Sequence, residues 1–179
     1  MGEFILIIFV LAIVGGIGYA IYNEIQKKEH GKLLASDERM QNAKVFNKHI
    51  NTAIAISENG YIGVIDPKTK QPRIIHIKDI NGFEIIVDGQ NVVNMGGAVV
   101  GGLLFGGVGA LLGGGAHKQK IKKMNLLFKV NDFSNPTIDL PLLSVEVKKG
   151  GMIYNAIQNE LQELMATLEF VEKNCKKKK

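Results

Sequence analysis

The sequence has one cysteine, no tryptophan and four histidines, and these scarcities narrow the kinds of site it can hold. Cys175 alone cannot form an intramolecular disulfide or a cysteine-based metal cluster. The histidines lack the spacing of metal ligands: they are His30, His49, His76 and His117. No G-K-[ST] follows the paired glycines, and the motifs G-x-S-x-G, H-E-x-x-H and C-x-x-C are absent. We therefore predict a protein that is not an enzyme and has no catalytic residue, metal or cofactor.

Positive charge is in excess only at the end of the chain. The 22 lysines and arginines exceed the 17 acidic residues, but four of these lysines form the run Lys176–Lys179. No patch of interleaved basic and aromatic residues accompanies them, so we expect no nucleic-acid partner. The basic tail at 173–179 is expected either to lie on an anionic membrane surface or to be a solvated end.

A long apolar run lies near the N-terminus. Phe4–Tyr22 is 19 residues without a charge, which as a helix spans roughly 28 Å, close to the hydrocarbon thickness of a bilayer. A cleaved signal peptide would need a basic segment before the run, and only Met1, Gly2 and Glu3 precede it. We therefore predict an uncleaved transmembrane anchor at 1–23, and membrane lipids as partners.

Basic residues flank this run on one side only, and they predict its orientation. Lysines and arginines cluster after the anchor and favour the cytoplasmic side of the cell membrane. The N-terminus is thus expected outside and the body inside, joined by a juxtamembrane helical linker at 24–51. The basic residues that carry this prediction are Lys27, Lys28, Lys32, Arg39 and Lys44.

From residue 52 the pattern changes to short β-type runs. Asn59-Gly60 between two apolar runs predicts a hairpin, and Pro141 should place the last strand at a sheet edge. After Gly150-Gly151 the apolar period becomes that of an amphipathic helix, expected to cover the open face of the sheet. The expected strands are 52–57, 61–66, 73–78, 83–88, 91–93, 125–130 and 137–142, and the apolar helix positions are Ile153, Ile157, Leu161, Leu164, Leu168 and Val171.

A glycine-rich apolar segment at 95–116 interrupts the strands. It has no charge, and ten of its residues are glycine. In a helix, small residues four apart form a stripe that lets helices approach closely inside a membrane and permits homo-oligomers. The competing interpretation is an apolar loop tucked against the domain. The stripe, the predicted membrane-packing site, comprises Ala98, Gly102, Gly106, Ala110 and Gly114.

Basic residues flank this insertion on both sides, so both flanks are expected in the cytoplasm. The strands before and after it are also predicted to belong to one sheet. A shallow re-entrant hairpin or a segment lying in the membrane interface fits both features; we favour the hairpin, with a single membrane crossing as the alternative. The lysines after the insertion are predicted to face the membrane: they are Lys118, Lys120, Lys122 and Lys123.

The order of these parts resembles a known family. The insertion follows F-E-I-I-V-D-G, and N-L-L-F-K-V-N-D and K-K-G-G-M-I-Y-N-A come after it. This resembles small bacterial and phage proteins of the pleckstrin-homology-like (PH-like) type, which carry a glycine-rich hydrophobic insert. The resemblance implies an α+β fold: an antiparallel β-domain at 52–94 and 117–172, closed by the C-terminal amphipathic helix, with the insertion between strands.

The N-terminal anchor adds a second resemblance, to superinfection-exclusion proteins of temperate phages of Gram-positive bacteria. It implies that the protein acts at the host membrane and blocks DNA entry by a second phage. An envelope protein or an incoming phage protein would then be its partner. Two alternatives remain open: a membrane-active protein that oligomerises through its glycines and alters permeability, and a membrane-bound PH-like adaptor.

Overall fold

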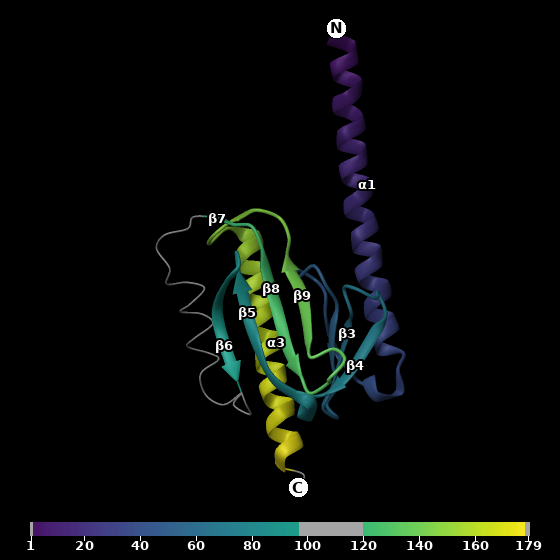
Figure 1. Cartoon of the computed structure of the whole chain (residues 1–179). Helices are drawn as coiled ribbons and strands as arrows, with labels where there is room; N and C mark the ends of the chain where they lie inside the picture. The colour runs from purple at the N-terminus through teal and green to yellow at the C-terminus, as the bar shows by residue number, and fades with distance from the viewer. Residues whose placement is uncertain (1, 97–119, 178–179) are drawn as a thin grey trace.

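The computed structural model describes residues 2–96 and 120–177, and their side chains at 14–90 and 120–175 (Figure 1). The chain is an α+β protein with antiparallel sheets. The elements are α1 (Gly2–Ala35), η1 (Glu38–Met40), β1 (Lys44–Phe46), β2 (Ile54–Ile56), β3 (Tyr61–Ile65), β4 (Pro72–His76), η2 (Ile77–Asp79), β5 (Ile80–Val87), β6 (Gln90–Gly96), β7 (Lys120–Ile121), β8 (Met124–Val130), β9 (Thr137–Leu143), β10 (Val147–Lys148) and α3 (Met152–Lys177).

Within residues 2–96 and 120–177, the strands form two four-stranded sheets and a short ribbon. The first sheet has the order β1-β2-β3-β4, the second β6-β5-β8-β9, and β10 pairs with β7. All the strand pairs are antiparallel. Pro141 lies in β9, which is an edge strand as predicted, because proline has no N–H to donate to a further neighbour.

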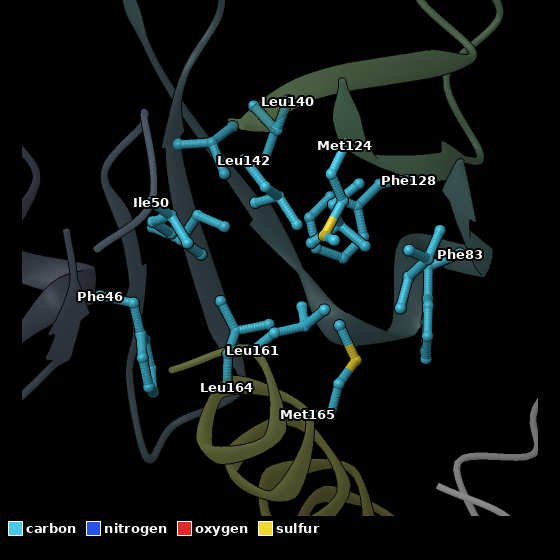
Figure 2. Close-up of a cluster of buried hydrophobic side chains, with 14 of the residues drawn as sticks. Phe46, Ile50, Phe83, Met124, Phe128, Leu140, Leu142, Leu161, Leu164 and Met165 are labelled. Atoms are coloured by element: carbon cyan, nitrogen blue, oxygen red, sulfur yellow. The ribbon is translucent and has the colours of Figure 1, made fainter. Parts of the chain in front are cut away.

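Helix α3 closes the domain as predicted, with its apolar side against both sheets. Leu161, Leu164 and Met165 of α3 lie opposite side chains from the strands in the buried cluster of Figure 2. The predicted apolar positions of this helix are buried, with one exception: Ile153, in its first turn, keeps 60% of its surface exposed. Its neighbour Tyr154, in the same turn, is 3% exposed and lies in the main core, so the first turn directs Tyr154 and not Ile153 toward the sheets.

Two turns between strands have the positive φ values that tight hairpins require, and the first was predicted. Ser57 accepts a hydrogen bond from the N–H of Gly60, whose φ of 91° closes the β2–β3 hairpin. Asp88 and Gly89 also have positive φ, at 50° and 80°. Two successive positive φ values match the twist of paired strands, and they connect β5 to β6.

The N-terminal region differs from the predicted division into an anchor and a helical linker. A single helix, α1, continues through residue 23 and ends at Ala35, and residues 44–46 of the predicted helical linker are strand β1. The helix ends where Ser36 bonds the Leu33 carbonyl oxygen and Asp37 caps η1, since such side chains compete with helical backbone bonds. Within the described part of the chain, no helix combines the length and apolar character needed to cross a membrane. The transmembrane span therefore stays a prediction.

The last turns of α1 are packed against the first sheet. Leu34 is fully buried with Met40, and a Cβ at Gly63 of β3 would lie 3.2 Å from the Leu34 Cδ2 atom. The Asn47 side-chain amide donates to the Lys27 carbonyl oxygen at 3.2 Å. Glycine in β3 thus makes room for the helix, and the direction of α1 relative to the β-domain is set by close packing.

The two flanks of the insertion belong to one sheet, as the sequence suggested. Both β6 and β8 pair with β5, so they run parallel to each other on either side of it. Gly96 lies opposite Gly82, whereas Met124 lies opposite Val87, about 17 Å further along the sheet at 3.4 Å per residue. The insertion therefore leaves the second sheet at one end and returns to it at the other. The course of residues 97–119, hairpin or single crossing, lies outside the described residues.

Candidate functional site

The predicted site residues divide into two groups. The small-residue stripe (Ala98, Gly102, Gly106, Ala110 and Gly114) and Lys118 lie outside the described residues. The remaining predicted lysines are Lys120 in β7, and Lys122 and Lys123 in the link to β8, and all three are exposed.

The link that carries Lys122 and Lys123 is held by the β5–β6 turn. The Asp88 carboxylate accepts hydrogen bonds from the Lys122 and Lys123 N–H groups at 2.9 and 3.0 Å, and the Asp88 N–H donates to the Lys123 carbonyl oxygen. These bonds use the backbone of both residues and leave their ammonium groups at the surface.

The β7–β10 ribbon adds two lysines that the sequence analysis did not assign to this site. Val147 pairs with Ile121 and both are buried, so the alternating pair Lys148–Lys120 faces outward. Lys149 follows directly, half-buried. The only local signal was the K-K-G-G stretch, and two residues of strand are too short for alternation to reveal its partner.

Two acidic groups lie among these lysines, at Asp88 and Glu146. The Lys120 Nζ atom lies 2.7 Å from Glu146 Oε1. This hydrogen bond lowers the pKa of Glu146 and raises the pKa of Lys120, so both stay charged near neutral pH. Five lysines against two carboxylates leave this end of the domain positive.

Exposed apolar side chains lie among the same segments. Val145 precedes β10 with 60% of its surface exposed, and Met152 and Ile153 begin α3 with 89% and 60% exposed. We call this surface the basic end; it consists of Lys120, Lys122, Lys123, Lys148, Lys149, Val145, Met152 and Ile153.

Figure 1 places the basic end relative to the two termini. The ribbon of β7 and the start of α3 lie at the end of the β-domain toward which α1 projects, and the C-terminus lies at the opposite end. Helix α3 therefore ends, at Lys177, at the far end of the domain from this surface. Among the described residues, no group of three His, Cys, Asp or Glu side chains could hold a metal ion. The lysines of the basic end are suited to attracting anions, and its exposed apolar side chains are suited to contact with an apolar surface.

Comparison with known proteins adds three findings. The family described as "Glycine zipper containing PH domain" matches residues 25–144. A protein of Bacillus phage SPbeta named "Immunity protein" is 28% identical over 155 residues, which cover 80% of this chain and 77% of that protein. A Bacillus subtilis (strain 168) protein named "SPbeta prophage-derived uncharacterized membrane protein YomJ" is 28% identical over 155 residues, 80% of this chain and 68% of its own length. No solved structure matches.

Proposed function

Because the chain belongs to the family of glycine zipper containing PH domains, we propose that it is a non-enzymatic, membrane-anchored protein of phage immunity. In this proposal it acts by superinfection exclusion, blocking the DNA of a second phage at the host membrane. Its partner is an envelope protein or an incoming phage protein. The body lies on the cytoplasmic side, where injected DNA and its escorting proteins first emerge.

The names of two relatives support this proposal. One is named an immunity protein of a phage and the other a prophage-derived membrane protein. Their similarity extends over 80% of this chain, which is more than the β-domain alone, and this supports carrying the proposal to the chain as a whole.

The structural observation that carries the proposal is the packed joint between α1 and the first sheet. Leu34 is buried under that sheet, and Lys27 is bonded to Asn47. The apolar run Phe4–Tyr22 ends five residues before Lys27, or about 7.5 Å along a helix. A helix anchored through this run holds the β-domain close to the membrane surface, as a protein that intercepts DNA entry requires.

The test separates DNA entry from the steps before and after it. Host cells expressing the protein are challenged with a panel of phages, and plaque numbers, adsorption and intracellular phage DNA are measured. We expect fewer plaques and less phage DNA inside the cells, with adsorption equal to that of cells carrying an empty vector. Normal DNA entry for every phage that is restricted would contradict exclusion at the membrane.

A second candidate function is an increase in membrane permeability through oligomerisation of the glycine-rich segment. The glycine zipper in the family's description favours it, because small-residue stripes bring membrane helices together. The same cultures distinguish the two functions before any phage is added. Growth arrest with entry of a membrane-impermeant dye would support permeabilisation, whereas normal growth and dye exclusion are expected for an exclusion protein.

A further inference from the structure

We propose that the basic end of the β-domain docks on anionic lipid headgroups. The body then lies in contact with the inner leaflet and is not separated from it by solvent. The inference rests on the proposed membrane anchor for its orientation. Its own support is the composition and placement of the basic end, to which lysines contribute from two segments more than 20 residues apart in the sequence.

The first argument is reach. The Lys27 carbonyl oxygen is bonded to Asn47, and a Cβ at Gly31 would lie 3.0 Å from the Asn47 side-chain nitrogen. The helix is therefore in contact with the domain within a few residues of Tyr22, the last residue of the apolar run. Since α1 projects beyond the end of the domain where β7 lies (Figure 1), that end faces the membrane in which the run is anchored.

The second argument is charge. The outward side chains of Lys120 and Lys148 stand side by side on the ribbon, and Lys122 and Lys123 follow on the adjoining link. Basic clusters next to a membrane helix are attracted to anionic lipids. Glu146 accompanies Lys120 and does not cancel the cluster, because the other lysines outnumber the carboxylates there.

The third argument is the apolar surface between the lysines. Met152, with 89% of its surface exposed, is flexible and unbranched, and Ile153 and Val145 accompany it. Exposed apolar side chains beside lysines are the composition of surfaces that lie in the headgroup region of a bilayer. An acidic protein surface would pair with the lysines but would give the exposed apolar side chains no apolar partner. Anionic lipid offers both a negative charge and an apolar region, so it is the better match.

The opposite end of the domain provides an internal control. Phe133, between β8 and β9, is fully exposed, but its neighbour Asp132 is acidic and forms an ion pair with Arg73. A probe at residue 133 therefore samples an exposed apolar position that is not part of the basic end.

The experiment uses the full chain with Cys175, its only cysteine, changed to serine. Met152→Cys and, separately, Phe133→Cys are labelled with an environment-sensitive dye. Each protein is reconstituted into vesicles of phosphatidylcholine alone and into vesicles that also contain phosphatidylglycerol. We expect a blue shift of emission at residue 152 when phosphatidylglycerol is present, its loss at high salt, and no such shift at residue 133.

A charge-reversed variant identifies the groups responsible. Lys122→Glu combined with Lys148→Glu should abolish the blue shift at residue 152 while circular dichroism stays unchanged, since both side chains are exposed. Flotation with neutral vesicles reports the anchor separately. A chain that floats but shows no lipid-dependent shift at residue 152, or an equal shift at residue 133, would overturn docking while leaving the anchor intact. A shift at residue 152 without flotation on neutral vesicles would support docking and contradict the anchor.

Discussion

At the scale of single residues, a buried carboxylate joins two segments that lie far apart in the sequence. Glu160 of α3 is 6% exposed, and its carboxylate accepts the N–H groups of Lys48, His49 and Ile50 at 2.9, 2.5 and 3.1 Å. Successive N–H groups that converge in this way form a concave site for an anion. Here the anion belongs to the protein itself, and it fastens the segment after β1 to the closing helix.

Glu160→Gln should therefore destabilise the protein although it preserves the shape of the side chain. The amide keeps one oxygen acceptor but loses the charge, and it turns an NH₂ group toward backbone donors. We expect a loss of about 2 kcal/mol in the free energy of unfolding, measured by urea denaturation of the full chain.

Glu163→Gln is the matched control, one turn further along α3. Glu163 is exposed and forms an ion pair with Lys44 at 2.6 Å, and such surface pairs contribute about 1 kcal/mol or less. Equal losses for the two variants would show that the cluster of N–H groups around Glu160 does not stabilise the fold.

At the scale of secondary-structure elements, the joint between α1 and the first sheet decides how the body is held. Leu34 is fully buried with Met40, Ala53, Ala55 and Ile65 in a small cluster separate from the main core. Leu34 is the member of this cluster that belongs to α1, so the burial of its side chain measures how firmly the helix is held on the sheet.

Leu34→Ala should loosen α1 without unfolding the main core. Removing a fully buried leucine side chain costs about 2–5 kcal/mol, and that cost falls on the joint. We expect faster amide hydrogen exchange at 31–35 while α3 keeps its protection. Leu33→Ala, at a neighbouring position that is 47% exposed, should leave exchange unchanged. Faster exchange throughout α3 in the Leu34 variant would mean that the joint is part of the main core.

The elements that the sequence predicted are those whose signals are local. Asn59-Gly60 identifies a hairpin, and the apolar period after Gly151 identifies α3. The strands that escaped prediction, β1, β7 and β10, have two or three residues each, too few for alternation to appear. Ile153 matched the helical period but is exposed while its neighbour Tyr154 is buried, because a period predicts a face of a helix and not what covers it.

At the scale of the whole molecule, the basic end was only half predictable. Lys120, Lys122 and Lys123 lie together in the sequence and were predicted as one site. Lys148 joins them only because β10 pairs with β7, and Glu160 meets its partners across more than 100 residues. The pairing of β6 and β8 with β5 also places the flanks of the insertion at opposite ends of the second sheet. No local pattern of residues predicts this placement.

We propose that α1 holds the β-domain at the membrane and that the domain faces the membrane with its basic end. In this proposal the apolar run anchors the protein in the membrane, and the β-domain recognises a component of the incoming phage. The N-terminal residues should therefore be replaceable by another membrane helix, whereas the joint around Leu34 should not be dispensable.

The most direct test of this claim is the efficiency of plating of a restricted phage on cells that express three forms of the protein in equal amounts. These are the full chain, residues 23–179 alone, and residues 23–179 fused after an unrelated single-span helix of the same orientation. We expect a low efficiency of plating on cells with the full chain, a normal efficiency on cells with the truncated form, and a low efficiency again on cells with the fusion. Full protection by residues 23–179 found only in the soluble fraction would contradict the claim.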